Sequence, residues 1–495
     1  MKITLIMVLM LSSFTLFSAE NNFLTIIGGG GEPVDAVNTQ FDTGITNLSA
    51  FYQANKNNYK TTVNFNGGHR ETEALVADKY KDATIENGFN QDSYDKMIKE
   101  YLRKITANPP EIKEGDKIMI FINDHGGESK GDTHSISASA SAMQSMNSGS
   151  HDGMISLDTL AQLTAAAEKA KVKLAIIDGT CHSGNSIPLS NSKTCVITAS
   201  GPKHYGYSSF AETFANNMVK GKNLEDAFLE TRAQLNGDGF PEISTPEGKL
   251  VQAELYPMLT PYMYYHDEYR GMALDKIDIY LKARAPAYET EMCMRQNEYI
   301  KLDKLITLIE DMTSIEKKAL FSKKITMEKT IDLSELKKQL KSYHEVQEDY
   351  LKRLSSVRRP MLETKEPMKI GTDTMSPYTH KELLDGNWAS YMADKNKDLE
   401  DTTLTEEKRK DLTYDRDFYA AAALAKEKIL REHPEYAQYQ NILDELKTNT
   451  KTSKTIASSI ARGAQTAYDA YYKNTKKKLA DGDKNYANPC KDFVL

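Results

Sequence analysis

Short apolar runs alternate with amphipathic segments from Phe23 to about residue 260, and this alternation constrains the fold more than any other feature of the sequence. Five runs have the length and composition of buried strands: 23–27, 61–65, 117–122, 172–177 and 194–198. Helical spacing occurs between or after them, at 94–105, 157–170, 210–219 and 224–235. Alternating strands and helices are typical of βαβ units, so this half is predicted to be an α/β domain with a mainly parallel sheet flanked by helices.

The pattern becomes helical beyond residue 270. Apolar side chains from Leu336 to Val357 follow a 4-3-4-3 spacing, which predicts a helical hairpin or short coiled coil within 270–358. A stretch with three prolines, 359–387, is predicted to be a linker. Three further helices, near 405–432, 434–447 and 453–479, predict a C-terminal helical domain over 388–495. An α/β domain spanning 20–269 is therefore expected to be followed by an all-α region.

The N-terminus has the pattern of a secretory signal peptide. Met1-Lys2 precedes an apolar and small run over 3–17, and Ser18-Ala19-Glu20 follows, which predicts cleavage after Ala19. The run is too short for a comfortable membrane span of about 20 residues, and no later stretch reaches that length. We therefore expect a secreted or periplasmic protein without a stable membrane span. Phe17, the third residue back from the predicted cleavage site, departs from the small residue usual there. Retention of this segment as an N-terminal anchor therefore stays open.

Composition narrows the classes of function. The 63 Lys and Arg residues are outnumbered by 70 Asp and Glu residues, a net charge of −7, so a nucleic-acid partner is not expected. Four cysteines are too few for a disulfide framework in a chain of 495 residues. Cys195 lies within an apolar run and is expected in the core. Cys293 and Cys490, in helical and tail sequence, could pair in an oxidising compartment, although spacing alone cannot show that pairing.

Two of the predicted strands end in residues that carry chemistry. One run leads into Asp124-His125-Gly126, and another into Asp178-Gly179-Thr180-Cys181-His182-Ser183-Gly184. Because ligands bind beyond the carboxyl ends of parallel strands, His125 and Cys181 should be delivered to one edge of the sheet. A histidine within hydrogen-bond reach activates a thiol nucleophile. The backbone N–H groups of Gly126 and Cys181 are candidate donors to a developing oxyanion.

These two motifs resemble those of the caspase-fold cysteine peptidases, which include legumains, metacaspases, gingipains and clostripain relatives. His125-Gly126 matches the His-Gly of that superfamily, and Cys181-His182-Ser183-Gly184 matches the metacaspase Cys-His-Ser-Gly; the resemblance covers about residues 22–260. It implies a caspase-like fold, His125 as general base, Cys181 as the nucleophile that forms an acyl-enzyme, a peptide or protein substrate, and no cofactor. No cluster with metal-ligand spacing surrounds His182, so no metal is expected.

The same resemblance places the first specificity pocket. In this fold the pocket is lined by the loop after the first strand, the end of the cysteine strand and the segment after the next strand. The candidates here are Glu32, Asp35, Asp178 and Ser200. The acidic lining predicts cleavage after Lys or Arg, with an Asn preference as in legumain the runner-up. Metacaspases place an acidic residue two before the cysteine, whereas Asp178 is three before it, which puts its role in doubt.

Two alternatives remain for the enzyme. One is a catalytically inactive caspase-fold binding module. The other is an α/β-hydrolase with a cysteine nucleophile, because Gly179-Thr180-Cys181-His182-Ser183 fits the elbow pattern. That hydrolase needs a helix directly after the nucleophile, where Pro188 argues against one, and its histidine would be His204 or His266.

Two further regions allow several interpretations. The Ser- and Gly-rich insertion from Gly126 to Gly153 is expected to be a mobile loop, either a solvated excursion or a lid. The C-terminal helices are interpreted as a cover over the active site, a substrate-recruiting surface or a structural brace, and the first of these implies intramolecular contact with the peptidase domain.

Overall fold

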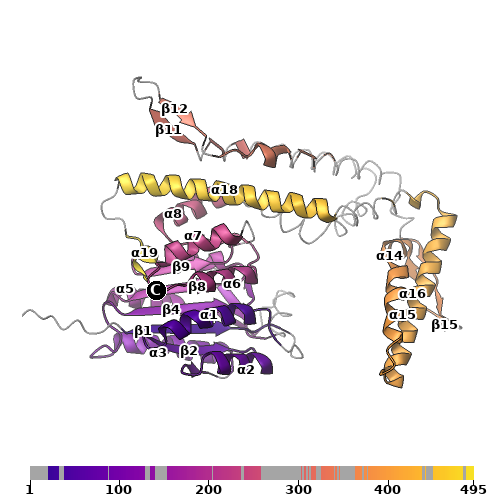
Figure 1. Cartoon of the computed structure of the whole chain (residues 1–495), viewed down its shortest axis with the longest axis horizontal. Helices are drawn as coiled ribbons and strands as arrows, with labels where there is room; N and C mark the ends of the chain where they lie inside the picture. Colours follow the sequence, from indigo (N-terminus) through magenta and orange to yellow (C-terminus); the bar gives the residue numbers. More distant parts are fainter. Residues whose placement is uncertain are drawn as a thin grey trace, which may run out of the picture. The chain divides into compact units, whose positions relative to one another are not determined.

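The computed structural model describes most of the first half of the chain and parts of the second (Figure 1). In the first half the described residues are 21–257, except 33–37, 87, 129–133, 140–152, 203 and 236–238. Further on they are scattered positions between 303 and 345, then 363–495 except 371–372, 376, 438–440, 442–449 and 483–486. The predicted signal peptide, 1–19, lies outside the described residues. The chain forms two compact units, Met1–Pro257 together with Tyr468–Leu495, and Met258–Ala467.

A seven-stranded sheet forms the centre of the first unit, in the order β10-β9-β8-β4-β1-β2-β3. All neighbouring strands are parallel except β10, which pairs antiparallel with β9. The strands are β1 (Asn22–Gly28), β2 (Tyr59–Phe65), β3 (Thr84–Ile85), β4 (Lys117–Asn123), β8 (Lys173–Asp178), β9 (Thr194–Thr198) and β10 (Glu242–Ile243). This sheet, the flanking helices and the helical C-terminal region confirm the predicted α/β fold class.

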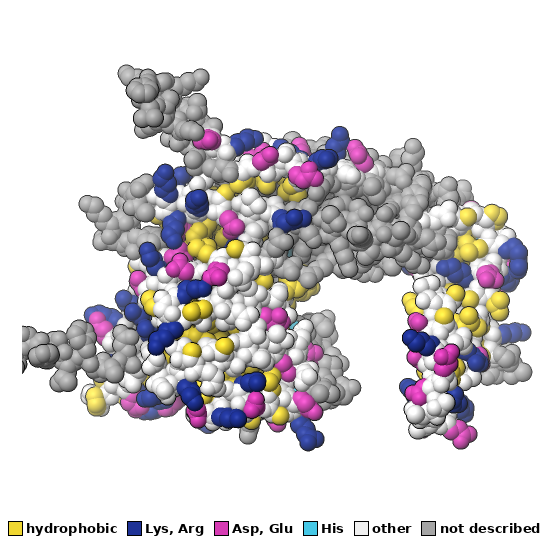
Figure 2. Space-filling model, in the orientation of Figure 1, with side chains coloured by type: hydrophobic (Ala, Val, Ile, Leu, Met, Phe, Trp, Pro, Cys, Tyr) yellow, Lys and Arg dark blue, Asp and Glu magenta, His cyan; other side chains and the backbone are white. Residues whose placement is uncertain are grey.

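Helices cover both faces of this sheet because its strands are apolar on both sides. Alternate side chains such as Ile120, Ile122 and Ile176 join one buried cluster with Tyr94 and Leu160. That cluster involves α3 (Gln91–Thr106) and α5 (Thr159–Ala170), while α1 (Asp42–Asn55), α2 (Arg70–Lys79), α6 (Ser208–Asn217) and α7 (Leu224–Leu235) form the other group of contacting helices. Figure 2 shows Lys and Arg interspersed with Asp and Glu over the visible described surface of this unit, the mixed character of an ordinary solvated face.

The insertion after His125 differs from the expected loop. The strands β5 (Gly126–Glu128), β6 (His134–Ser137) and β7 (Met154–Ser156) form a small antiparallel sheet. Ile136 and Ile155 are fully buried in the cluster that also holds α3 and α5. Two isoleucines at paired positions therefore tie the described parts of this insertion to the core, a contact that the surrounding serines and glycines conceal in the sequence.

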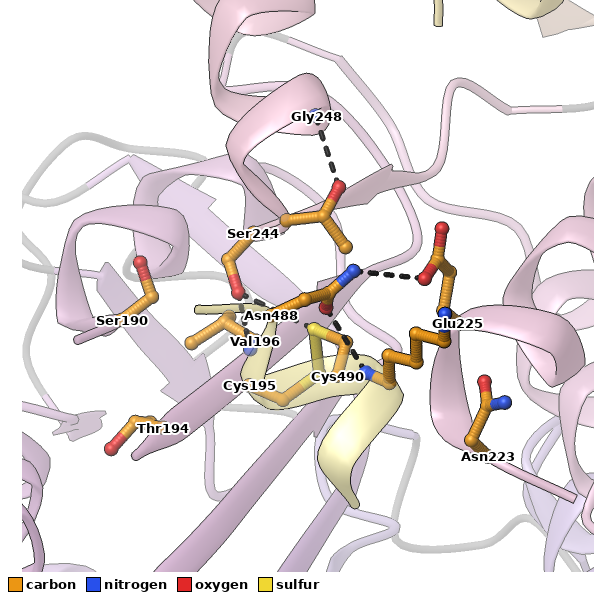
Figure 3. The surroundings of a disulfide bond; sticks show 12 residues. Ser190, Thr194, Cys195, Val196, Asn223, Glu225, Ser244, Gly248, Asn488 and Cys490 are labelled. Carbon is orange, nitrogen blue, oxygen red and sulfur yellow. Dashed lines mark hydrogen bonds between the residues drawn. A yellow bond between two sulfur atoms is a disulfide. The ribbon is translucent and has the colours of Figure 1, made fainter. Parts of the chain in front are cut away.

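The end of the chain returns to the first unit. The helix α18 (Thr450–Gly482) enters this unit at Tyr468, and α19 (Pro489–Asp492) packs beside β9, where Cys490 forms a disulfide with Cys195 (Figure 3). Leu224 and Gly221 donate backbone hydrogen bonds to Phe493 and Leu495. The predicted pairing of Cys293 with Cys490 is therefore wrong, and Cys293 itself lies outside the described residues. The predicted domain 388–495 is divided between the two units.

The second unit contains helices and short hairpins. Its described helices include α14 (His380–Asp385), α15 (Trp388–Leu399) and α16 (Glu406–Glu432), which pack together through aromatic rings such as Trp388 and Tyr419. The predicted linker 359–387 contains α14 and the short strands β13 (Lys365–Glu366), β14 (Lys369–Ile370), β15 (Asp373–Thr374) and β16 (Tyr378–Thr379). A hairpin of β11 (Ile315–Lys318) and β12 (Ile325–Glu328) interrupts the region expected to be wholly helical.

No helix among the described residues combines the length and the apolar character needed to cross a lipid bilayer.

Candidate functional site

The two chemistry-bearing segments lie at one edge of the sheet, as their positions after parallel strands require. β4 and β8 are neighbours, with Ile122 paired to Asp178, so His125 and Cys181 each follow the pair by three residues. Gly126 lies against the cysteine segment. A Cβ atom on Gly126 would be 2.3 Å from the carbonyl oxygen of Cys181 and 2.6 Å from the Thr180 hydroxyl. Glycine is therefore required for this close approach.

The imidazole of His125 is oriented by the loop that follows β1. Its Nε2 atom lies 2.9 Å from the amide nitrogen of Gln40 and 3.6 Å from a carboxylate oxygen of Glu32, and its ring meets Phe41 edge-on. Burial lowers the pKa of His125, while the nearby Glu32 carboxylate opposes that shift. The amide nitrogen of Gln40 is a donor, so Nε2 accepts in this contact and the proton of the neutral imidazole lies on Nδ1.

Asp124, the residue before His125, contacts the backbone of this histidine. Its carboxylate is buried and accepts the backbone N–H of His125 at 2.6 Å. Burial raises the pKa of Asp124 well above its usual value, against the lowering effect of the backbone N–H groups of His125 and Gly30.

Cys181 is partly exposed and is not disulfide-bonded. Its thiol donates a hydrogen bond to the carbonyl oxygen of Gly206 at 3.5 Å. The next residue, His182, has a φ of 58°, a left-handed conformation that is uncommon outside glycine. The N–H of His182 donates to the carbonyl of His204 at 2.8 Å. The chain thus turns sharply after Cys181, and backbone strain at a strand end is typical of functional sites.

The four predicted pocket residues have different positions. Glu32 lies beside His125, with a carboxylate oxygen 3.6 Å from Nε2, and Asp35 lies outside the described residues. Asp178 and Ser200 are completely buried. Asp178 accepts hydrogen bonds from the Thr180 and Ser186 hydroxyls at 2.7 and 2.6 Å. Ser200 donates to the carbonyl of Thr180 at 3.3 Å.

The prediction that Asp178 and Ser200 contact the substrate is therefore wrong. A carboxylate placed at a strand end is enclosed here because the chain after Cys181 folds back over it, and its hydrogen-bonding capacity is used by neighbouring hydroxyls. Both residues instead fix the backbone on either side of Cys181.

Two residues of this region were missed in the sequence. Gln40 contacts His125 from a loop with no recognisable motif, so no sequence signal could have found it. His134 lies within the Ser- and Gly-rich insertion, and its Nε2 is 2.7 Å from the Thr180 hydroxyl. Its position 11 residues after the end of β4 was the one available signal in the sequence.

The backbone after Cys181 tests the alternative of an α/β-hydrolase, whose nucleophile lies on a sharp turn called the nucleophile elbow. It forms a 3₁₀ helix, η1 (Ser183–Leu189), which contains Pro188 and leads to β9. A nucleophile elbow continues instead into a full α-helix against the sheet. His204 is buried and meets Tyr256 edge-on. The local backbone therefore argues against the nucleophile elbow.

Among the described residues, no group of three or more His, Cys, Asp or Glu side chains is arranged to hold a metal ion.

No protein-family model matches the sequence, and no curated protein is significantly similar to it.

Proposed function

We propose that this protein is a cysteine endopeptidase in which Cys181 is the nucleophile and His125 the general base. The observation that carries the proposal is the contact between the two strand-end segments, with Gly126 packed against Thr180 and Cys181. The half-buried, oriented imidazole of His125 and the partly exposed thiol support it.

The reaction follows the usual course of thiol acyl transfer. His125 accepts the thiol proton, and the Cys181 sulfur attacks the carbonyl carbon of the scissile bond, so that the carbonyl electron pair moves to oxygen. The oxyanion collapses, the C–N bond breaks, and His125 returns the proton to the leaving amine. Water then attacks the thioester with His125 as base, the C–S bond breaks, and the Cys181 thiol is regenerated.

For the residue before the scissile bond we propose Lys or Arg. The support is the carboxylate of Glu32 at the dyad, together with Asp35 in the same loop of the sequence. A cationic side chain that enters beside a partly buried carboxylate gains a partner there, whereas an acidic side chain meets repulsion. Asp178 takes no part in this proposal, because its carboxylate is enclosed.

We also propose that the mature protein acts outside the cytoplasm. The apolar N-terminal run is one support. The Cys195–Cys490 disulfide is another, because disulfides persist in oxidising compartments and are rare in reducing ones.

A library of fluorogenic peptides that differ before the scissile bond tests the activity directly. We expect hydrolysis by the wild-type protein, highest after Lys or Arg, and a loss of at least about a thousandfold in Cys181→Ala and in His125→Ala. Brief iodoacetamide treatment followed by mass spectrometry should modify Cys181 in the wild type and much more slowly in His125→Ala.

Thermal unfolding serves as the control, since neither side chain fills the core and both variants should unfold close to the wild-type temperature. Undiminished hydrolysis in Cys181→Ala would contradict the proposal. An alkylated wild-type protein that hydrolyses no peptide would favour the inactive binding module instead.

A further inference from the structure

A chain of buried hydrogen bonds lies directly beneath the proposed nucleophile. His134, Thr180 and Asp178 are all nearly or completely buried. The His134 Nε2 atom is 2.7 Å from the Thr180 hydroxyl, and that hydroxyl donates to Asp178 at 2.7 Å. Asp178 also accepts the backbone N–H of Thr180 at 3.2 Å and the hydroxyl of Ser186 at 2.6 Å. Polar groups enclosed in this way form bonds that are costly to break.

The direction of these bonds follows from the number of protons available. The Thr180 hydroxyl has one proton, and it is donated to Asp178. The same oxygen must then accept from His134, so Nε2 carries the proton of a neutral imidazole. Burial lowers the pKa of His134, and the Asp178 carboxylate, 3.5 Å from Nε2, opposes that shift. Because the Thr180 proton is donated to Asp178, His134 is the donor in its bond to Thr180.

The bond between His134 and Thr180 joins the two halves of the site. His134 belongs to β6, whose Ile136 pairs with Gly126 at the start of β5. Thr180 directly precedes Cys181. Gly126 and Cys181 are the residues whose backbone N–H groups are proposed to hold the oxyanion. Within the described residues, this side-chain bond links the hairpin that carries one donor to the strand end that carries the other.

We propose that His134 is a positioning residue that holds the Gly126 and Cys181 N–H groups at the separation required by the oxyanion. This inference rests on the proposed peptidase function and deepens it. His134 touches neither the thiol nor the substrate in this role. It acts through Thr180 on one side and through the β5–β6 pairing on the other, and small displacements of such donors have large kinetic effects.

The chemistry separates this role from a general structural one. Peptide hydrolysis passes through an oxyanion, because the carbonyl electron pair moves to oxygen when sulfur attacks. Alkylation by iodoacetamide displaces iodide from a saturated carbon and forms no oxyanion. A defect confined to oxyanion positioning should therefore slow hydrolysis and leave alkylation of Cys181 unchanged. A defect in the thiol, in His125 or in folding should slow both.

The experiment compares His134→Leu, which removes the donor, with His134→Gln, which retains an N–H donor. We expect kcat of His134→Leu to fall by about 10- to 100-fold, in the range of a weakened oxyanion donor, with KM within about twofold of wild type. The pH profile and the rate of Cys181 alkylation should not change. His134→Gln should recover most of the lost kcat.

A second pair of variants keeps the test independent of the folding of His134→Leu. Thr180→Val removes the bridging hydroxyl, whereas Thr194→Val removes an equally buried hydroxyl at the start of β9 that has no hydrogen-bond partner in the described structure. Thr180→Val should reproduce the fall in kcat, and Thr194→Val should not. The double variant His134→Leu/Thr180→Val should be little worse than either single one, because both remove the same bond.

Three outcomes overturn the inference. Wild-type kcat in both His134→Leu and Thr180→Val would show that the bond does not position the donors. A parallel loss of hydrolysis and alkylation would assign the network a purely structural role. Hydrolysis that survives in Cys181→Ala, or its complete absence in the wild type, would refute the proposed function itself and is distinguished from the other two by that variant.

Discussion

At the scale of single residues, burial and charge act in opposite directions on the His125 imidazole. Burial disfavours the imidazolium and lowers the pKa of His125, while the Glu32 carboxylate favours the imidazolium and raises it. The net direction is downward, so the base remains neutral to a lower pH than an ordinary histidine. A general base with this environment is ready to accept the thiol proton near neutral pH.

Replacing Glu32 tests this balance. Because Glu32→Gln removes the group that raises the pKa of His125, that pKa should fall further, and the acidic limb of the kcat/KM profile should move to lower pH. The comparison uses the wild type, Glu32→Gln and the control Glu114→Gln on one peptide; Glu114 is exposed and precedes β4, at the opposite end of that strand from His125. Movement of the acidic limb to higher pH, or of the alkaline limb alone, would contradict His125 as a neutral general base.

At the scale of elements, the tail of the chain is part of the sheet unit. The helix α18 contributes Tyr472, whose hydroxyl lies 2.9 Å from Thr245 and donates to the buried Glu225 at 3.0 Å. Glu225 also accepts from Lys476 and from Asn488, the last at 2.9 Å (Figure 3). The ring of Tyr468 faces the buried guanidinium of Arg232, 3.5 Å from the ring centroid. Without residues Tyr468–Leu495, the tail of the chain, the Glu225 carboxylate and the Arg232 guanidinium would lose these partners.

The disulfide between β9 and α19 adds a covalent link to this contact. It closes a loop with a sequence separation of 295, which strongly restricts the unfolded chain. We expect the double variant Cys195→Ser/Cys490→Ser to lose about 2–4 kcal/mol of unfolding free energy, as is typical for a native disulfide. Denaturant unfolding of this variant, the wild type and the control Cys181→Ser measures the loss.

The control separates the disulfide from the general effect of replacing a cysteine. Cys181→Ser should unfold like the wild type. An equal midpoint for the double variant would mean that the tail is held by its hydrogen bonds and buried rings alone.

At the scale of the whole molecule, the first unit is built from two distant parts of the chain, Met1–Pro257 and Tyr468–Leu495. The intervening 210 residues, Met258–Ala467, form the other unit. A protein that ends before Tyr468 leaves the apolar side chains that pack on this part, among them Phe240 opposite Tyr468, without their partners. The sheet and its flanking helices are therefore incomplete in a chain that ends near residue 270.

Two shortened chains test this arrangement. Residues 20–257 alone should be insoluble or unfold at a much lower temperature than the intact protein. The same residues joined by a flexible linker to 468–495 should fold and form the Cys195–Cys490 disulfide. Circular dichroism, thermal unfolding and disulfide mapping distinguish the two.

Peptide hydrolysis by the linked chain then addresses the second unit. Faster cleavage of small peptides than by the full chain would support a covering role for residues 258–467. Unchanged cleavage of small peptides with poorer cleavage of a protein substrate would support recruitment. A stable and fully folded 20–257 chain would contradict the inference that the tail completes the unit.

The sequence by itself determined the α/β architecture, because apolar periodicity is a local property. The runs that became β1, β2, β4, β8 and β9 agree with the observed strands to within one or two residues, and α7 agrees at both ends. It also placed the segments that carry His125 and Cys181 at one edge of the sheet, because the ends of neighbouring parallel strands share an edge. The sequence analysis did not predict α1, α2 or β6. The sequence of β6 is rich in serine, and Ile136 is its one apolar residue in the core.

Only the tertiary structure decided which side chains face the site and which are enclosed. Asp178 has a position at a strand end like that of His125, yet the segment after Cys181 covers it, and its carboxylate binds hydroxyls instead of solvent. Cys195 forms a disulfide with Cys490, 295 residues away in the chain, and no local sequence pattern predicts a pairing over that separation. Long-range contacts depend on how completed elements pack, so they are absent from the sequence spacing that determines the elements themselves.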